Sequence, residues 1–218
     1  MKFQDRVHAA NILADRLKHT VKSAMVDKDE DIVVLGIPRG GVVIADVVAT
    51  KLSAEFDIVI GRKLRAPANK ELAIGAVMED GTAYFNDYLV KALRIPPEYL
   101  EKEKLDQMNE IKRRTAVYRK VIDYKVANKV VILVDDGIAT GATVIATARW
   151  IRKQEPKFLM IAVPVAPSQT VDMLKHEVDA VETVASPFDF NAVGEFYENF
   201  DPVTDEHVIE IMKNRNLL

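Results

Sequence analysis

The sequence predicts an α/β fold with a doubly wound, mainly parallel sheet. Short runs of apolar, often β-branched residues recur along the chain without a polar face, as expected of strands that helices bury on both sides. Helical patterns follow most of these runs after short connections, and strand–helix–strand units of this kind build parallel sheets. Hydrophobic residues make up 49% of the 218 residues, which is enough for one large domain with a sizeable core.

Each predicted element has its own signal. Apolar residues at steps of three and four indicate helices, and continuous β-branched runs indicate buried strands. Proline suits the first turn of the long charged helix, and Thr204 can cap the last one. In chain order the predicted elements are a helix at 3–25, a strand at 32–37, a helix at 42–52, a strand at 56–60, a hairpin of 72–78 and 82–85 turning at 79–82, a helix at 97–120, a strand at 129–134, a helix at 140–154, a strand at 158–163, a helix at 168–176, a strand at 180–184 and a helix at 204–215.

We expect a single domain over residues 1–218, with its core at about 30–86 and 128–200. The fold includes an inserted hairpin and a long helix, and a small hood formed by segments near the two ends of the sequence. The additions to the core are the N-terminal helix 3–25, the helical insertion at about 87–126 and the C-terminal helix at about 204–215.

The composition excludes several classes of site. Without cysteine there are no disulfides, thiolate nucleophiles or cysteine-bound zinc, and the four histidines lack the spacing of metal ligands. A net charge of −3 disfavours a nucleic-acid-binding protein. No stretch approaches the roughly 18 apolar residues of a membrane span, and the first residues do not resemble a signal peptide. We expect a cytoplasmic protein that binds neither nucleic acid nor membrane.

The most informative segment is residues 131–143, VILVDDGIATGAT. A buried strand ends at Asp135 and Asp136, and a turn of small residues then opens a helix. Small residues let backbone N–H groups approach a phosphate, and the helix N-terminus adds donors and a favourable dipole. Two carboxylates suit the hydroxyls of a vicinal diol, or a sugar linked to Mg²⁺. A capped, tightly packed helix start would explain either half alone, but the whole run indicates ribose 5-phosphate.

The same run resembles the signature with which type I phosphoribosyltransferases bind 5-phosphoribosyl-1-pyrophosphate (PRPP): four hydrophobic residues, two acids, a turn and T-G-x-T. One departure is Gly137, where the family usually has a larger aliphatic residue. The resemblance implies that Asp135 and Asp136 hold the ribose hydroxyls and meet metal only through PRPP-bound Mg²⁺. It further implies that the 5-phosphate is bound by Ala139, Thr140, Gly141, Ala142 and Thr143.

Two other segments fall where this family places its pyrophosphate-binding residues. Pro38-Arg39-Gly40-Gly41 follows the first strand, where the resemblance implies a non-proline cis peptide at Pro38–Arg39; a purely structural turn is the alternative. A Walker A loop is excluded because Val42-Val43 replaces its Lys-Ser/Thr. Arg62-Lys63 follows the second strand, with solvated loop charges as the alternative. The implied pyrophosphate-binding residues are Arg39, Gly40, Gly41, Arg62 and Lys63.

The resemblance also implies a flexible loop and a base-binding segment. Residues 64–76 correspond to the loop that closes over the transition state, with Lys70 and Glu71 as candidates for contacting pyrophosphate or base. Residues 186–200 correspond to the segment that contacts the nucleobase. An ordinary core position is the alternative for each aromatic residue there. The candidates for base contact are Phe188, Phe190 and Ile138.

Residues 97–120 are an insertion relative to compact members of the family. The N-terminal half of this segment is acidic, and Arg113, Arg114, Tyr118 and Arg119 crowd its C-terminal end. A surface helix whose charges follow the helix dipole explains this order. The alternative is a lid or dimer arm that brings an arginine to a phosphate.

We therefore expect a PRPP-dependent phosphoribosyltransferase, which is a kind of glycosyltransferase. Its cofactor would be Mg²⁺, its acceptor would resemble a nucleobase, and the protein would form a homo-oligomer, a dimer. Catalysis would consist of positioning and of neutralising the leaving pyrophosphate with Arg39, Arg62 and Lys63. Ala139 stands where relatives acting on 6-oxopurines carry an acid, which argues against guanine and hypoxanthine as acceptors. Two alternatives stay open: a regulator with this fold that binds PRPP or a nucleotide without turnover, and an unrelated α/β phosphate-binding enzyme.

Overall fold

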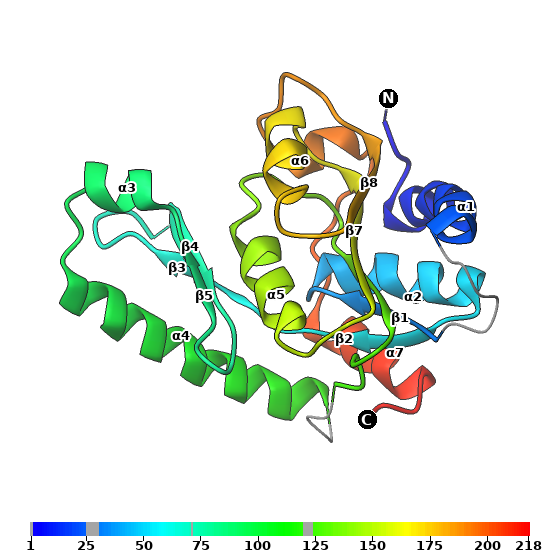
Figure 1. Ribbon diagram of the computed structural model, residues 1–218, viewed down its shortest axis with the longest axis horizontal. Helices are drawn as coiled ribbons and strands as arrows, with labels where there is room; N and C mark the ends of the chain where they lie inside the picture. The colour runs from blue at the N-terminus through cyan, green and yellow to red at the C-terminus, as the bar shows by residue number, and fades with distance from the viewer. Residues whose placement is uncertain (1, 25–30, 71, 120–123) are drawn as a thin grey trace.

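A five-stranded parallel sheet in the order β2-β1-β6-β7-β8 forms the centre of the molecule (Figure 1). The computed structural model describes residues 2–24, 31–70, 72–119 and 124–218. All neighbouring strands of this sheet pair in parallel, which confirms the predicted α/β fold. The strands are β1 (Ile32–Gly36), β2 (Glu55–Ile58), β6 (Val130–Val134), β7 (Phe158–Val165) and β8 (Ala180–Ala185).

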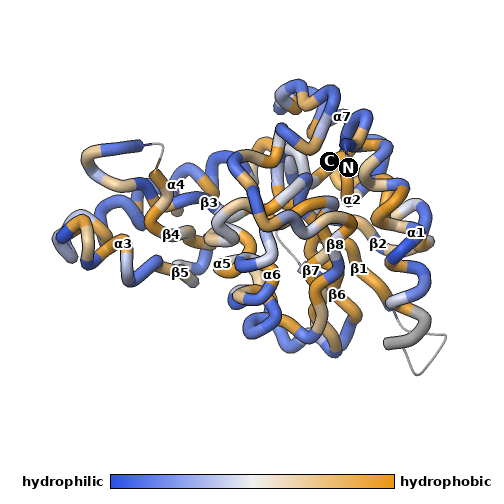
Figure 2. The backbone as a smooth tube through the Cα atoms, turned by 90° about the horizontal axis from the view of Figure 1, so that it is seen from above, coloured by the Kyte–Doolittle hydropathy of each residue, from blue (hydrophilic) through white to orange (hydrophobic). Residues whose placement is uncertain are grey.

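Helices cover both faces of this sheet. On one face lie α1 (Arg6–Ala24) and α2 (Gly40–Leu52), and on the other lie α5 (Ala142–Arg152) and α6 (Ser168–Leu174) (Figure 1). Successive residues of a strand point to opposite faces. Accordingly, alternate residues of β1, β6 and β7 are buried in two separate cores, and these strands are hydrophobic along their length (Figure 2). This double burial is why the sequence shows apolar runs without a polar face.

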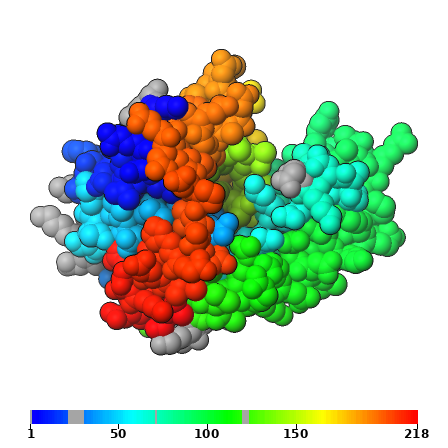
Figure 3. All heavy atoms as spheres, turned by 180° about the vertical axis from the view of Figure 1, so that it is seen from behind, coloured from blue at the N-terminus to red at the C-terminus, as the bar shows by residue number. Residues whose placement is uncertain are grey.

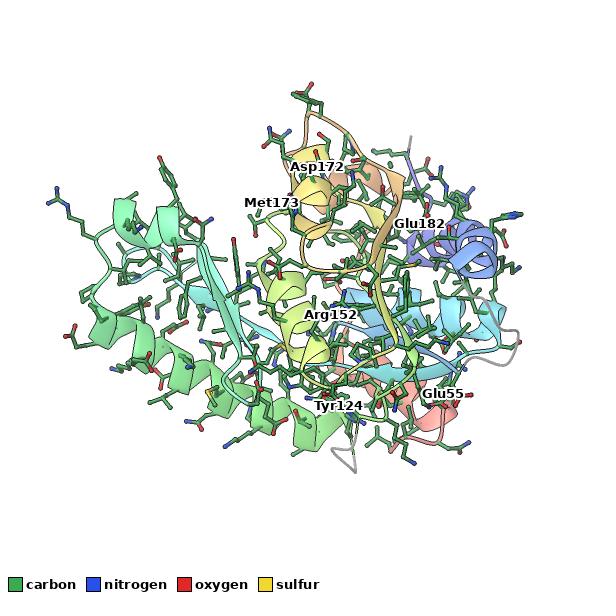
Figure 4. All side chains as sticks on the ribbon, viewed as in Figure 1. Glu55, Tyr124, Arg152, Asp172, Met173 and Glu182 are labelled. Carbon is green, nitrogen blue, oxygen red and sulfur yellow. The ribbon has the colours of Figure 1, made fainter. Side chains whose placement is uncertain are left out.

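Unlike these strands, the helix α6 is buried on one side only. Asp172 and Met173 point away from the sheet (Figure 4), while Val171 and Leu174 are buried against it. The helix therefore has one apolar face, as expected for a layer that covers a sheet from one side. Among the helices of the described ranges, none is long and apolar enough to span a membrane.

A second, antiparallel sheet of three strands lies beside the first. The predicted hairpin is confirmed, and the Asp80 carboxylate closes its turn by accepting a 2.7 Å hydrogen bond from the backbone N–H of Thr82. The predicted loop over residues 64–76 is wrong at both ends, because Leu64 and Ile74 are buried and belong to strands. The elements of this region are β3 (Arg62–Arg65), β4 (Ala73–Val77), β5 (Ala83–Phe85), α3 (Asp87–Ala92) and α4 (Pro97–Tyr118).

The first residues of the described chain pack against residues 196–201. The first helix begins at Arg6 and not at residue 3, because Phe3 forms an isolated parallel bridge with Tyr197. Tyr197 follows the short helix η1 (Val193–Phe196). The last helix, α7 (Asp205–Asn214), is capped as predicted by the Thr204 hydroxyl, which accepts a 3.2 Å hydrogen bond from the His207 N–H.

Candidate functional site

A cavity opens between β1 and β6, where the order in which the chain adds strands to the sheet reverses. The chain continues from β1 to β2 on one side, and from β6 to β7 and β8 on the other. In open α/β sheets, ligands bind at the carboxyl ends of strands beside such a switch point. Gly36 pairs with Val134, so the loops that follow β1 and β6 face each other. Between them lies a cavity of about 500 Å³, visible as a hollow in Figure 3.

Most of the predicted site residues line this one cavity. It brings together the acids after β6, the turn that precedes α5, the loop after β1 and the basic residues that follow β2 in sequence. The predicted residues that line it are Arg39, Gly40, Arg62, Lys63, Asp135, Asp136, Ile138 and the segment Ala139–Thr143.

The other candidates lie elsewhere. Gly41 is buried behind the cavity wall, and Lys70 is exposed away from it. Phe188 is 83% exposed, and Phe190 stacks on Phe196 with ring centroids 5.3 Å apart. Glu71 lies outside the described residues. Beside Ile138, the apolar wall of the cavity comes from Val193, Phe200, Pro202 and Val203, which were not named as candidates, although Val193 and Phe200 lie in the predicted segment 186–200.

The turn after the acids leads into the start of α5 inside the cavity. Gly141 is the N-cap and has φ of 77°, a left-handed conformation that favours glycine. The backbone N–H groups of the next residues have no partner within the helix, and Ala142 and Thr143 line the cavity. The Thr170 hydroxyl from α6 donates a 2.7 Å hydrogen bond to the Ala139 carbonyl oxygen and fixes the turn. This arrangement suits a phosphate group.

Asp135 and Asp136 form a buried pair of acids. The backbone N–H of Asp136 donates a 2.8 Å hydrogen bond to Oδ1 of Asp135. Burial, and then the charge of Asp136, raises the pKa of Asp135 well above its ordinary value. Burial also raises the pKa of Asp136, although Arg6 opposes the shift. Negative charge on this pair is therefore costly without a ligand, and hydroxyl or cationic groups of a ligand would be favoured beside it.

Arg6 is a site residue that the sequence did not reveal. Its Nε donates a 2.8 Å hydrogen bond to Oδ2 of Asp136, and its Nη1 donates another of 2.8 Å to the Asp201 carbonyl oxygen. Its guanidinium lies 4.0 Å from the centre of the Phe200 ring. In the sequence Arg6 is one polar residue of an amphipathic helix, and only long-range packing distinguishes it from its neighbours.

Gly40 and Gly41 allow α2 to begin against the acids. A Cβ at position 40 would lie 1.8 Å from Oδ2 of Asp136, and one at position 41 would lie 2.8 Å from the backbone of Asp135. The glycines of this loop are therefore required by close packing. The peptide bond Pro38–Arg39 is cis, as the resemblance implied.

Gly137 is explained by a neighbour that fills the space beside it. A Cβ at this position would lie 2.5 Å from Cγ1 of Val193 and 3.1 Å from Cγ1 of Val165. The larger aliphatic residue usual in the family therefore has no room here. Val193 occupies that room from η1 and forms part of the apolar wall of the cavity.

Basic side chains gather opposite the acids. Arg62 and Lys63 lie on β3 and not in a loop, and Nε of Arg62 donates a 3.0 Å hydrogen bond to Gln107 of α4. Arg39 forms an ion pair of 3.4 Å with Asp205 at the start of α7. Arg65 and Arg114 also line the cavity. A concentration of positive charge on one wall suits a polyanion.

The acids also determine what kind of metal site this cavity can form. In the described part of the chain, no group of three or more His, Asp or Glu side chains could hold a metal ion. Asp136 is already engaged by Arg6, and Asp135 is its buried neighbour. Mg²⁺ takes about six oxygen ligands and often keeps phosphate and water oxygens among them. The residues therefore fit an ion that arrives with a phosphorylated ligand, not one held by the protein alone.

Comparisons with known proteins show the family to which the chain belongs. Two proteins of Mycobacterium tuberculosis, from strains CDC 1551 and H37Rv and provisionally named phosphoribosyl transferases, are each 36% identical over 211 residues, which is 96% of this chain and 46% of theirs. The chain thus spans about half the length of these relatives. The crystal structure of TT1426 from Thermus thermophilus matches with a TM-score of 0.79 and 41% identity, over 98% of this chain and 99% of that one. Residues 4–197 match the phosphoribosyl transferase domain, and the chain belongs to that family.

Proposed function

We propose that this protein transfers a 5-phosphoribosyl group from PRPP to a nucleobase-like acceptor and releases pyrophosphate. The observation that carries the proposal is a single cavity in which a helix N-terminus, two carboxylates and several cations meet. The helix N-terminus and the Thr140 and Thr143 hydroxyls suit the 5-phosphate. The carboxylates can accept hydrogen bonds from both ribose hydroxyls. The cations suit the pyrophosphate.

The proposed reaction is a displacement at C1 of the ribose. The bond from C1 to a pyrophosphate oxygen breaks and pyrophosphate leaves with its electron pair, while the lone pair of an acceptor nitrogen forms the new bond to C1 and that nitrogen releases its proton to water. Asp135 and Asp136 would stabilise the positive charge that develops on the ribose ring. Arg39, Arg62 and Lys63 would bind the leaving pyrophosphate, whose negative charge Mg²⁺ would partly neutralise when bound. The protein thus contributes positioning and charge, with no covalent intermediate.

The acceptor would lie against the apolar wall formed by Val193, Phe200, Pro202 and Val203. A flat ring suits such a wall, to which Phe200 contributes apolar contact while its ring packs against the Arg6 guanidinium, 4.0 Å from the ring centre. Ala139 adds no acid to the cavity, which supports an acceptor other than guanine or hypoxanthine.

Release of pyrophosphate tests the proposal. Purified protein is incubated with Mg²⁺ and PRPP and with single members of a panel of purine and pyrimidine bases. We expect release that saturates with PRPP and depends on the base. Asp136→Asn should lower kcat/KM by roughly 100-fold, as expected for loss of an electrostatic contact in the transition state. The matched control is Asp189→Asn, because Asp189 is exposed and does not line the cavity.

The outcomes separate the proposal from its alternatives. Saturable PRPP binding without turnover across the panel would favour a regulatory protein of the same fold. Failure to bind PRPP at all would reject both, and would favour a different phosphorylated ligand. Equal activity of Asp136→Asn and the wild type would remove Asp136 from the site.

A further inference from the structure

The helix α4 runs from the antiparallel sheet to the last helix, α7 (Figure 1), and its Arg114 lines the cavity. In its first turn, the Tyr99 hydroxyl donates a 2.9 Å hydrogen bond to the Arg65 carbonyl oxygen of β3. In its last turn, the Tyr118 hydroxyl donates a hydrogen bond to Asp205 of α7. Asp205 in turn pairs with Arg39 in the loop after β1. One end of α4 is therefore anchored to β3, which carries residues of the cavity, and the other end is linked through Asp205 to Arg39, which lines the cavity.

The two neighbouring arginines of α4 lie on different faces. Ile111, Thr115 and Tyr118 form the buried face of the helix. With about 100° between successive residues, Arg114 lies beside this face and Arg113 lies nearly opposite it. The side chain of Arg114 is 26% exposed and that of Arg113 is 63% exposed. Of the two, Arg114 lines the cavity and Arg113 does not.

Both arginines share one partner. Glu110 accepts a 2.8 Å hydrogen bond from Nε of Arg113 and a 2.9 Å hydrogen bond from Nε of Arg114. A surface helix whose charges follow the helix dipole accounts for Arg113, which is exposed and pairs with Glu110 of its own helix. It does not account for the position of Arg114 on a cavity wall.

The surroundings of Arg114 indicate what it could bind. Arg39, Arg62, Lys63 and Arg65 line the same cavity. The pKa of Arg62 is lowered, first by burial and then by the positive charge of Arg114. Like charges that converge on a partly buried cavity repel each other, and a bound polyanion removes that repulsion. The guanidinium group is suited to such a ligand because it can donate two parallel hydrogen bonds to phosphate oxygens.

We propose that Arg114 of the inserted helix is a direct ligand of the pyrophosphate group of PRPP, together with Arg39, Arg62 and Lys63. This inference rests on the proposed function and assigns a role to the insertion. The helix supplies a cation from outside the core, from an element that compact members of the family lack. Because negative charge on the pyrophosphate increases as its bond to C1 breaks, the contact would strengthen in the transition state.

Arg114→Ala and the matched control Arg113→Ala test the inference. Each variant removes one arginine of the Glu110 pair from the same helix, but only one of them removes a cation from the cavity. Binding of inorganic pyrophosphate with Mg²⁺, and separately of ribose 5-phosphate, is measured by titration calorimetry. We expect Arg114→Ala to weaken pyrophosphate binding by about 10- to 100-fold, the range for one hydrogen-bonded charge. Arg113→Ala should change it less than about twofold, as for a surface ion pair.

Ribose 5-phosphate serves as the second control because it carries no pyrophosphate. Its affinity should be the same in the wild type and in both variants, and Arg114→Lys should bind pyrophosphate with intermediate affinity. Equal weakening of pyrophosphate binding by both alanine variants, or none by Arg114→Ala, would overturn the role of Arg114 and leave the proposed function standing. A wild-type protein that binds neither pyrophosphate nor PRPP would overturn the proposed function itself, and this inference with it.

Discussion

Arg6 and Asp136 are joined by a 2.8 Å ion pair that links the first turn of α1 to the acids after β6. Their side chains are only 11% and 15% exposed. Water screens a pair at this depth weakly, so the guanidinium offsets much of the penalty that burial imposes on the carboxylate. Arg6 thereby favours the ionised form of Asp136, which is the form that can accept hydrogen bonds from ribose hydroxyls.

Replacing Arg6 with methionine should lower the free energy of unfolding by about 3 kcal/mol at pH 8, because a buried carboxylate loses its partner. Without Arg6, burial would hold the pKa of Asp136 still further above that of the unfolded chain. Stability of the variant should then fall as pH rises through the folded-state pKa, so the loss shrinks toward acidic pH. Urea unfolding between pH 5 and 8 measures both effects.

The matched control is Arg16→Met on the same helix. Arg16 forms a more exposed pair with Glu182 at 3.8 Å, and its loss should cost less than about 1 kcal/mol at every pH. An Arg6→Met variant as stable as Arg16→Met would show that the buried pair contributes nothing to the fold.

Gly137 and Val193 should behave as a coupled pair. Gly137→Ala places a methyl group 2.5 Å from Cγ1 of Val193 and should destabilise the protein by about 2 kcal/mol through overpacking. Val193→Ala opens that space, so the double variant should recover more than half of the loss. A double-mutant cycle of unfolding free energies measures the coupling. If the unfolding free energies of the two single variants simply add in the double variant, the contact between positions 137 and 193 is contradicted.

Asp135→Asn should stabilise the protein without ligand while abolishing PRPP binding. The pKa of Asp135 is raised by burial and by Asp136, so the folded state binds more protons than the unfolded state between the two pKa values. Stability therefore falls as pH rises through that window, and removal of the charge restores it. We expect a gain of about 1 kcal/mol at pH 7 that shrinks toward pH 4, measured by calorimetry. An Asp172→Asn control, on the exposed side of α6, should show no gain, and a lower Tm of Asp135→Asn at pH 7 would refute the expectation.

Thr170→Val removes the hydroxyl that holds the turn at Ala139 and nearly preserves the shape of the side chain. The lost hydrogen bond should cost about 1 kcal/mol of stability. The affinity for ribose 5-phosphate should fall several-fold, because the backbone donors of the turn are then less well positioned. Titration calorimetry checks the second effect. Unchanged affinity would limit Thr170 to a role in packing.

The wall proposed to bind phosphate was predictable because its signals are local. Asp135, Asp136 and the turn into α5 stand together in sequence, and each residue type has a direct physical use there. Strand β4 was predictable because the apolar run around Ile74 forms one arm of the expected hairpin. Strand β3 was not, because Arg62–Arg65 carries three cations around one buried leucine and is typical of a charged loop.

The apolar wall was not predictable in the same way. Phe188, Phe190 and Phe200 stand in one aromatic-rich segment, and nothing local ranks them. Phe200 lines the cavity and lies against Arg6. Phe190 does not line the cavity, and its ring stacks on Phe196. The position of Arg114 was predictable in part. The spacing of Ile111, Thr115 and Tyr118 indicates the packed face of α4, but not the cavity beside it.

The contact between Arg6 and Asp201 joins residues 195 positions apart, and this separation imposes an order on how the site is made. Contacts between distant residues are the slowest to form in folding, and a chain leaving the ribosome presents its N-terminal segments first. The strands that carry the acids and the phosphate turn can pair before residue 201 has been synthesised. The wall with Val193 and Phe200 can close only afterwards. During synthesis, the acids and the turn into α5 can therefore form before the wall that would receive an acceptor, while the contact between Arg39 and Asp205 also waits for the end of the chain.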